Sequence, residues 1–200
     1  PTVVTATQSQ VNVLCNGQCT GTATVVAAGG TPGYTYTWST VPVQYTATAT
    51  GLCAGSYTVT IKDANGCTIT NTFTITQPTI VTATQSQVNV LCNGQCTGTA
   101  TVVAAGGTPG YTYTWTTVPV QYTATATGLC AGSYTVTIKD ANGCTITRTF
   151  TITQPTVVTA TQSQVNVLCN GQCNGTATVV AAGGTHGYTY TWSTVPVQYT

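Results

Sequence analysis

The chain has 200 residues, of which 42% are hydrophobic and 2% are charged; three are Lys or Arg, two are Asp or Glu, and the formal net charge is +1. Three cations cannot form the basic patch that nucleic-acid binding requires. No apolar run approaches the roughly 20 residues of a membrane span. Because a nearly uncharged protein has little colloidal repulsion, the composition favours self-association.

The sequence repeats with a period of 77 residues. The run PTVVTATQSQVNVLCNGQC starts at Pro1, returns with one substitution at Pro78, and starts again at Pro155. Solenoid repeats have shorter periods of about 20–50 residues, so we predict two small domains at 1–77 and 78–154 and a partial third at 155–200. Pro78 and Pro155 restrict the residue before them, which predicts semi-rigid connections.

The two ends of the sequence suggest a piece of a longer protein. Pro1 replaces an initiator Met, and Thr200 lies inside a predicted strand. We expect a secreted precursor that continues past Thr200; completion of the third domain by a neighbouring chain is the alternative.

Within one repeat, apolar residues alternate with Thr, as is typical of half-buried strands. No segment has helical periodicity. The alternating runs are separated by turn sequences such as Asn16-Gly17 and Asn65-Gly66. About seven short strands at this spacing predict tandem, disulfide-stabilised, immunoglobulin-like β-sandwich domains, an all-β fold. The clearest runs are 22–28, 34–38, 45–50, 57–62 and 67–75.

Two features of these strands carry further expectations. Asn71 interrupts an apolar face and is Arg148 in the second copy, which predicts a β-bulge or a sheet rim there, since a buried unpaired Arg is costly. The Thr faces supply β-propensity and solubility without charge. Because edge strands are usually blocked by charges, we expect uncapped edges that permit lateral association; a hydroxyl array that binds ice or glycans is the alternative.

The ten cysteines predict disulfides. A small domain buries too little surface to be stable without help, and an even number of cysteines per domain indicates an oxidising compartment. A zinc site is the alternative for the Cys15–Cys19 spacing, but Cys53 and Cys67 do not form a second closely spaced pair of ligands. We therefore predict no metal, no cofactor and ten disulfide cysteines: Cys15, Cys19, Cys53, Cys67, Cys92, Cys96, Cys130, Cys144, Cys169 and Cys173.

The predicted topology favours one pairing. In an immunoglobulin-like order, the strand after Cys19 and the strand that ends near Leu52 are antiparallel neighbours, which brings Cys19 close to Cys53. Cys15 and Cys67 would then lie at opposite poles. Either the first strand runs differently and joins them, or each reaches a neighbouring domain or chain.

The sequence gives no support for an enzyme. His186 is the only His and occurs in one copy, and Asp63 and Asp140 stand alone, so triad and paired-carboxylate schemes lack their groups. Asp63-Ala64-Asn65-Gly66 favours a turn over a calcium loop. Tyr34, Tyr36 and Trp38 could form a sugar platform, but a Trp on the inward face of a sandwich strand favours a core position.

Five short motifs occur within one repeat: Cys15-Asn16-Gly17, Gly29-Gly30-Thr31-Pro32, Tyr34 to Trp38, Leu52-x-Ala54-Gly55-x-Tyr57 and Asp63-Ala64-Asn65-Gly66-Cys67. With these motifs the sequence resembles the SprB-type repeat of cell-surface adhesins in gliding Bacteroidota, over nearly all of each repeat. The resemblance implies an immunoglobulin-like domain that is exported and displayed at, or shed from, the cell surface.

Together these observations predict a secreted structural protein. We expect an extracellular fibre or adhesin stalk whose partner is the protein itself, in a homopolymer or a lateral bundle, with surface polysaccharide as a possible further partner. We expect no nucleic acid and no membrane span. The alternative is an adhesin that binds glycans or other surfaces.

Overall fold

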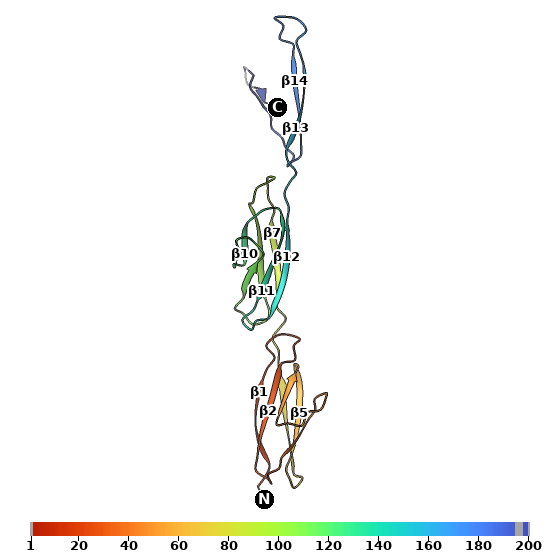
Figure 1. The fold of residues 1–200 in the computed structure, drawn as a ribbon, viewed down its shortest axis with the longest axis vertical. Helices are drawn as coiled ribbons and strands as arrows, with labels where there is room; N and C mark the ends of the chain where they lie inside the picture. Colours follow the sequence, from red (N-terminus) through yellow and green to blue (C-terminus); the bar gives the residue numbers. More distant parts are fainter. Residues whose placement is uncertain (1, 195–197, 200) are drawn as a thin grey trace. The chain divides into compact units, whose positions relative to one another are not determined.

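The computed structural model describes residues 2–194 and 198–199, which form strands and loops with no helix. The first repeat (residues 1–77) holds six strands. They are β1 (Thr5–Val11), β2 (Gly21–Ala28), β3 (Thr35–Trp38), β4 (Thr48–Leu52), β5 (Gly55–Lys62) and β6 (Thr68–Ile75), several of which are labelled in Figure 1.

The second repeat (residues 78–154) has the same six strands, and the described part of the third (residues 155–194 and 198–199) has four. Those of repeat 2 are β7 (Thr82–Val88), β8 (Gly98–Ala105), β9 (Thr112–Trp115), β10 (Thr125–Leu129), β11 (Gly132–Lys139) and β12 (Thr145–Ile152). Those of repeat 3 are β13 (Thr159–Val165), β14 (Thr176–Ala182), β15 (Thr191–Trp192) and β16 (Gln198–Tyr199).

Repeat 1 forms two antiparallel sheets that enclose one core. One has the strand order β1-β2-β4 and the other β3-β5-β6. These orders match the A-B-E and C-F-G orders of an immunoglobulin domain with one strand fewer, and repeat 2 reproduces both. The fold is therefore all-β, made of tandem immunoglobulin-like sandwiches. β4 begins at Thr48, later than predicted, because residues 39–47 form a loop.

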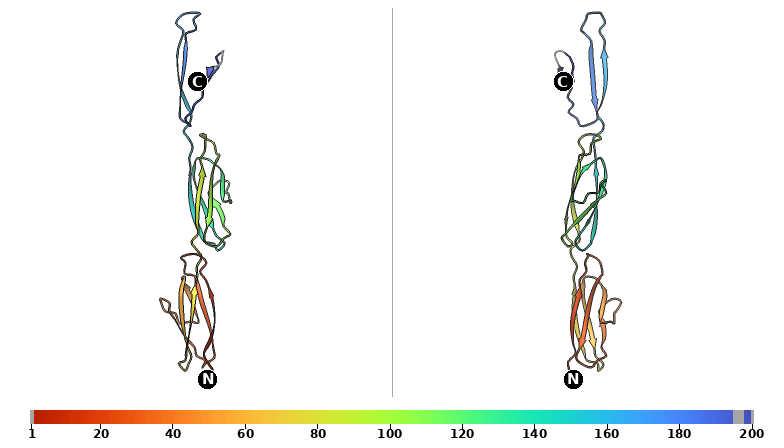
Figure 2. Two further views of the ribbon diagram at one scale, coloured as in Figure 1. Left: turned by 180° about the vertical axis from the view of Figure 1, so that it is seen from behind. Right: turned by 60° about the vertical axis from the view of Figure 1, so that its left-hand side comes forward.

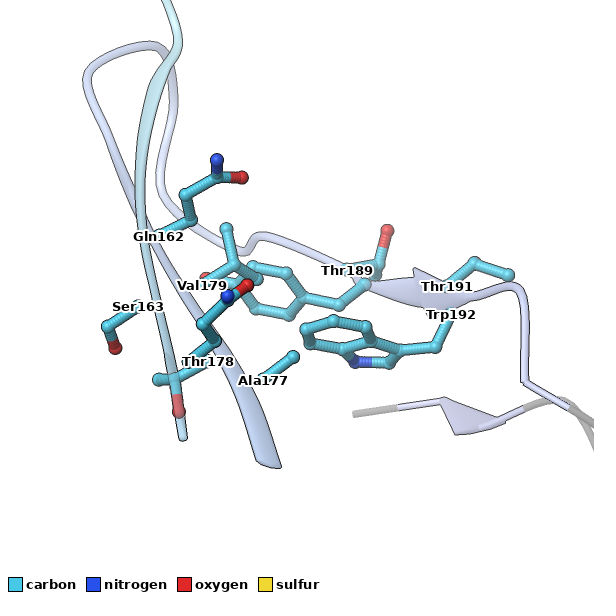
Figure 3. Close-up of a pocket in the computed structure, with 10 residues that line it drawn as sticks. Gln162, Ser163, Ala177, Thr178, Val179, Thr189, Thr191 and Trp192 are labelled. Atoms are coloured by element: carbon cyan, nitrogen blue, oxygen red, sulfur yellow. The ribbon is translucent and has the colours of Figure 1, made fainter. Parts of the chain in front are cut away.

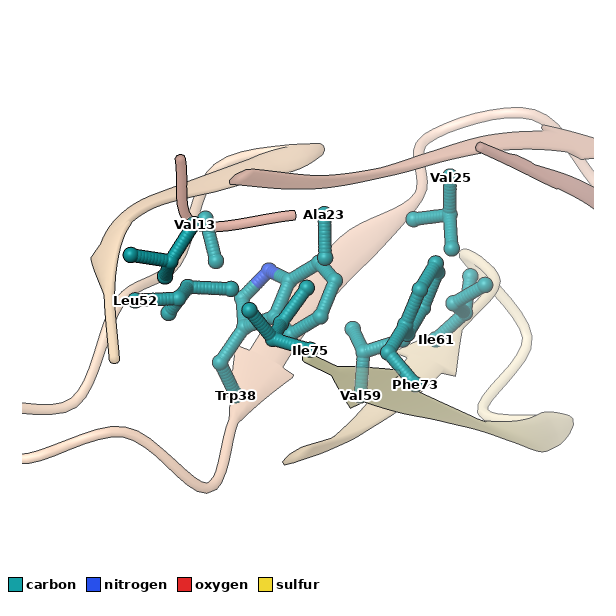
Figure 4. Close-up of a cluster of buried hydrophobic side chains, with 10 residues drawn as sticks. Val13, Ala23, Val25, Trp38, Leu52, Val59, Ile61, Phe73 and Ile75 are labelled. Carbon is teal, nitrogen blue, oxygen red and sulfur yellow. The ribbon is translucent and has the colours of Figure 1, made fainter. Parts of the chain in front are cut away.

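The core of repeat 1 lies between the sheets (Figure 4). The Trp38 ring packs against Phe73 with centroids 5.4 Å apart, and its indole N–H donates to the Thr46 carbonyl at 2.8 Å. The core placement of Trp38 is confirmed, since the side chain is 1% exposed; Tyr34 and Tyr36 pack against the core while partly exposed. The fully buried members are Val13, Ala23, Val25, Trp38, Ala49, Leu52, Val59, Ile61, Phe73 and Ile75.

The bulge predicted at Asn71 is wrong, because β5 and β6 pair without interruption and Asn71 lies opposite Val59. The expectation of a rim holds, since β6 is an edge strand. The half-buried polar side chain is satisfied across the sandwich: Asn71 Nδ2 donates to Gln8 Oε1 at 3.1 Å. In repeat 2, Arg148 Nε donates to the Ala83 carbonyl at 3.3 Å.

Repeat 3 keeps the first hairpin of the fold. β13 and β14 pair over seven positions from Thr159↔Ala182 to Val165↔Thr176, which is the register that β1 and β2 adopt. Figure 2 shows this hairpin from two further sides. The pairing is local in sequence, so it forms with few other strands present.

The chain divides into two compact units, each defined by close packing of its own backbone. The domain boundaries predicted from the repeat period are not tested by this grouping and stay a prediction. The first unit comprises Pro1–Thr84, Val103–Thr114 and Thr137–Arg148; the second comprises Gln85–Val102, Trp115–Val136 and Thr149–Thr200.

Candidate functional site

The first candidate feature is a disulfide that clamps β2 to β4. Gly21 and Leu52 face each other across this antiparallel ladder, so the residues just outside it, Cys19 and Cys53, meet and form a disulfide, as the topology predicts. Repeat 2 repeats the clamp with Cys96 and Cys130. Each clamp closes a loop of the chain across one sheet.

A tyrosine supports the clamp at the corner between β4 and β5. The Tyr57 hydroxyl donates to the Cys53 carbonyl at 3.2 Å, and Tyr134 does the same to Cys130 at 3.2 Å. Such a tyrosine corner at the start of the sixth immunoglobulin strand is a feature of the fold class. The clamp and the corner therefore fix the same turn of the chain.

The second feature is the loop between β5 and β6, which is built around a buried carboxylate. Asp63, 4% exposed, accepts the backbone N–H groups of Asn65 at 3.0 Å and Cys67 at 2.8 Å on Oδ1. Its Oδ2 accepts the N–H of Thr31 at 3.0 Å. The five-residue loop replaces the tight two-residue hairpin predicted at Asn65-Gly66, and it presents the Cys67 thiol to solvent.

The turn interpretation of Asp63 is thus supported, but the sequence reasoning missed how central this residue is. An Asp whose side chain accepts backbone N–H groups two and four positions on is a known turn device. The spacing Asp-x-Asn-Gly-Cys could have revealed it. One carboxylate ties together two loops that lie 32 positions apart in the sequence.

Hydrogen bonding lowers the pKa of both aspartates below the ordinary value of 3.8. For Asp63 the largest cause is the Thr31 N–H, which outweighs burial together with those of Cys67, Asn65 and Gly66. For Asp140 burial is the largest influence and acts to raise the pKa, but the backbone N–H groups of its loop overcome it. Both carboxylates are stabilised in the charged form.

This arrangement predicts acid destabilisation. A group whose pKa is depressed by folding contributes stability that is present above its unfolded pKa and is lost as the pH falls through its folded pKa. The melting temperature should therefore be level at weakly acidic pH and fall below about pH 3.8, the unfolded value. Thermal unfolding between pH 2 and 7, followed by circular dichroism, measures it.

A variant that lacks both acidic side chains is the control for the acid destabilisation. Asp63 and Asp140 are its only two acidic side chains, so the Asp63→Asn/Asp140→Asn variant should melt at a lower temperature and lose the acid dependence. An equally steep decline below pH 3.8 in this variant would show that the loops are not the cause.

The third feature is a disulfide between two repeats. Cys15 of repeat 1 is bonded to Cys144 of repeat 2, with Cα atoms 5.6 Å apart, and both lie in the first compact unit. Beside it, Asn142 Nδ2 donates to the Leu14 carbonyl at 3.1 Å. Of the two alternatives left open by the sequence, the sulfur of Cys15 thus reaches a neighbouring repeat, not Cys67 of its own.

The loop that carries Cys15 is held in place by the connecting segment. Asn16 Nδ2 donates to the Pro78 carbonyl at 2.9 Å, and the Gly17 N–H donates to Gln77 Oε1 at 2.8 Å. In repeat 2, Asn93 and Gly94 make the same two bonds with Pro155 and Gln154. Cys15 and Cys92 are therefore both presented on anchored loops.

Four cysteines are unpaired among the described residues, and for these four the expectation of a disulfide stays a prediction. Cys15 of the first repeat bonds to Cys144 of the following repeat. Under the same pairing, Cys67 and Cys92 have no partner among the described residues. The unpaired, exposed thiols are Cys67, Cys92, Cys169 and Cys173.

Glutamine side chains cover two points of the sheet edges, and the expectation of lateral association stays a prediction. On β4, Gln44 Nε2 donates to the Thr50 carbonyl at 2.9 Å and Gln44 Oε1 accepts the Thr50 N–H at 3.0 Å. On β6, Gln10 Nε2 donates to the Thr74 carbonyl at 2.8 Å. A primary amide has the donor and acceptor of a peptide group, so it can occupy an edge where other proteins place a charge.

The 39–47 loop also exposes apolar side chains. Val41 is 99% exposed and Tyr45 68% exposed, and the equivalents in repeat 2, Val118 and Tyr122, are 99% and 67% exposed. The same apolar side chains are thus exposed at the equivalent loop of repeats 1 and 2.

A cavity in repeat 3 corresponds to an open core (Figure 3). It has a volume of about 580 Å³ and is lined by residues that include Ala177, Val179 and Trp192. Their equivalents in repeat 1, Ala23, Val25 and Trp38, are fully buried in the core. The cavity is therefore the space that the other half of a sandwich fills in repeats 1 and 2.

The histidine of the chain makes an aromatic contact. His186 stacks edge-on to Tyr188, with centroids 6.1 Å apart. Across residues 2–194 and 198–199, no group of three His, Cys, Asp or Glu side chains is placed to hold a metal ion. The same residues include no helix long and apolar enough to cross a membrane.

The chain was compared with known proteins. A structure described as "Structural basis for Dscam isoform specificity" is similar over 76% of this chain, with 10% sequence identity and a TM-score of 0.33; the match spans 46% of that chain. No curated protein sequence matches. The model of the SprB repeat family matches three times, at residues 7–43, 84–120 and 161–197, which is more than half of the chain. The chain therefore belongs to the SprB repeat family.

Proposed function

We propose that the chain is part of a secreted structural protein that forms an extracellular fibre or an adhesin stalk. SprB repeats occur in cell-surface proteins, and the three disulfides suit an oxidising, extracellular environment. The role is mechanical and associative, and it requires neither a catalytic group nor a cofactor.

One observation carries this proposal: the Cys15–Cys144 disulfide joins consecutive repeats covalently. A tensile load on the chain would then pass through the bridge as well as through the connecting segment. A catalytic or ligand-binding module has no need of such a bond, whereas a load-bearing series of domains gains from it.

Lateral packing has a separate basis. Because the strand edges carry glutamine amides, we place side-to-side contacts at the 39–47 loops, where Val41 and its equivalent Val118 are almost fully exposed. The low charge removes the repulsion that would keep neighbouring fibres apart.

Electron microscopy tests the proposal. Negative-stain images of the oxidised chain should show uniform filaments that gather into bundles. A Val41→Ser/Val118→Ser variant should keep single filaments and lose the bundles, because the exposed apolar contacts are removed while the core is untouched. Dispersed particles under all conditions would contradict a fibre.

A second candidate function is glycan or surface binding. The exposed Tyr45 and Tyr122 support it, since an aromatic ring on a surface loop can stack on a sugar. Tyr36, the other aromatic considered, packs against the core and is less suited. Glycan-array binding that is lost in Tyr45→Ala/Tyr122→Ala, with unchanged melting temperature, would favour this function over the fibre.

A further inference from the structure

Four asparagine–glycine pairs occur in repeats 1 and 2, and two of them lie in the loops that the connecting segments hold. Asparagine deamidates most readily before glycine, because glycine has no side chain to obstruct the attack of its own backbone nitrogen. We propose that Asn16 and Asn93 are sites of spontaneous deamidation, and that their hydrogen bonds to the connecting segments control the reaction. The inference does not depend on the proposed fibre.

The loop that carries the first pair is open to water, so burial does not protect it. Asn16 and Gly17 are both exposed, and a Cβ added at Gly17 would meet no atom within 4 Å. The two residues form the centre of a turn that the Gln18 N–H closes on the Cys15 carbonyl at 3.2 Å. The φ of Gly17 is +77°, as the third residue of a type II turn requires. Sequence and exposure thus favour the reaction, and the hydrogen bonds of the loop decide whether it occurs.

The connecting segment holds both reacting groups of the pair. The nucleophile is the Gly17 nitrogen, whose N–H donates to Gln77 Oε1 at 2.8 Å. The leaving group is Asn16 Nδ2, which donates to the Pro78 carbonyl at 2.9 Å. Attack requires the Gly17 nitrogen to lose its proton and to approach Asn16 Cγ, so both bonds must open first. In repeat 2 the same two bonds are present.

The other two asparagine–glycine pairs are restrained by a different part of the structure. The Gly66 N–H donates to the Asp63 carbonyl at 3.0 Å, and Asn65 Nδ2 donates to Thr31 Oγ1 at 2.7 Å. Equivalent bonds are made around Asn142 in repeat 2. Because these bonds do not involve a connecting segment, Asn65 and Asn142 are internal references for the reaction at the other two sites.

The reaction consumes water and releases ammonia. The Gly17 nitrogen attacks Asn16 Cγ and forms a bond to it, while the bond from Cγ to Nδ2 breaks. The proton of the Gly17 nitrogen leaves with the amide nitrogen as ammonia. Water then opens the resulting cyclic imide at one of its two carbonyl carbons, which gives aspartate or isoaspartate. No atom is oxidised or reduced.

Deamidation prevents the loop from binding the connecting segment again. The aspartate product has only acceptor oxygens in the place where Asn16 Nδ2 donated its hydrogen bond. It therefore presents an acceptor to the Pro78 carbonyl, which is itself an acceptor. The isoaspartate product lengthens the backbone of the turn by a methylene group. A transient opening of the loop is thereby converted into its permanent release.

The test is incubation of the oxidised chain, with its free thiols alkylated, in a mildly alkaline buffer that speeds loss of the amide proton. The chain is then reduced, digested with trypsin and measured by mass spectrometry. Cleavage after Lys62 places Asn16 and Asn93 in different peptides, and fragment ions locate each modified residue. Both should deamidate at least about tenfold more slowly than in the reduced chain unfolded in guanidinium chloride, because two hydrogen bonds must open first.

Matched variants identify the connecting segment as the control. Gln77→Ala removes the acceptor of one N–H and should accelerate deamidation of Asn16 about fivefold, the effect of one lost hydrogen bond. Asn93 should keep its parent rate. Gln154→Ala should do the reverse. Gln77→Glu, which keeps an acceptor oxygen, should restore the parent rate. Both glutamines are exposed, so an unchanged melting temperature shows that each variant is folded.

Equal rates at Asn16 in the parent and in Gln77→Ala would overturn the inference, as would a folded parent that reacts as fast as the unfolded chain. Acceleration of Asn65 together with Asn16 would indicate general loosening of repeat 1 and would contradict control by the connecting segment. The Asn16→Asp variant, which carries the product, should exchange the Gly17 amide proton faster than the parent. Unchanged exchange would refute permanent release of the loop.

Discussion

The Trp38→Ala variant should lose about 3–5 kcal/mol of unfolding free energy in repeat 1, as is typical for removal of a large buried aromatic side chain. Trp38 is 1% exposed. Its ring packs against Phe73, which lies on the opposite edge strand of the same sheet. Truncation therefore opens a cavity between the sheets. It also leaves the Thr46 carbonyl without the indole donor. Small domains have only about 5–15 kcal/mol of stability in total.

Hydrogen exchange measured by mass spectrometry can assign this loss to one repeat. Peptides that contain Ser39 differ in mass from those that contain Thr116, so repeats 1 and 2 can be followed separately. Trp115→Ala should produce the same loss in repeat 2. Tyr45→Ala, at a 68% exposed position, should stay within about 0.5 kcal/mol of the parent. Equal effects of Trp38→Ala and Tyr45→Ala would refute the proposed core.

Removal of the Cys19–Cys53 clamp should cost about 4 kcal/mol by the chain-entropy model, because the bond spans 34 positions of the unfolded chain. The Cys19→Ser/Cys53→Ser variant should accordingly unfold at a lower urea concentration. The comparison is made on the oxidised proteins, so that the remaining disulfides are intact in both.

The matched control for this variant is Cys67→Ser, which removes an exposed, unpaired thiol and should leave the urea midpoint unchanged at low protein concentration. A double serine variant with the midpoint of the parent would mean that the clamp adds nothing to the fold. A shift confined to the slope of the transition would indicate a change in the surface exposed on unfolding, without the expected loss of stability.

Alternation of Thr with apolar residues was sufficient to predict most of the fold, because period two is set by the pleat of a strand and depends only on local sequence. The Cys19–Cys53 pairing follows from the strand order in the same way. The start of β4 was misplaced, since the 45–50 run also alternates, yet Gln44 and Thr46 are bound to neighbouring backbone and core groups within a loop.

The Cys15–Cys144 joint could not be derived from local pattern. Its two halves lie 129 positions apart, and two domains with the same sequence offer the same cysteines, so the sequence cannot distinguish Cys67 from Cys144 as the partner. The role of Asp63 was missed for a related reason: its Oδ2 partner, Thr31, belongs to another loop. The glutamine amides on the strand edges could not be predicted either, because the local sequence around a Gln does not show which backbone groups its side chain will contact.

Those amides have a consequence for the environments that the protein can tolerate. The Gln44 bonds to Thr50 involve no ion, so added salt cannot screen them and a change of acidity cannot switch them off. A lysine that protects an edge strand by charge repulsion loses its effect as ionic strength rises, because salt screens the charge. The backbone groups of Thr50 therefore stay covered alike in dilute fresh water and in concentrated brine.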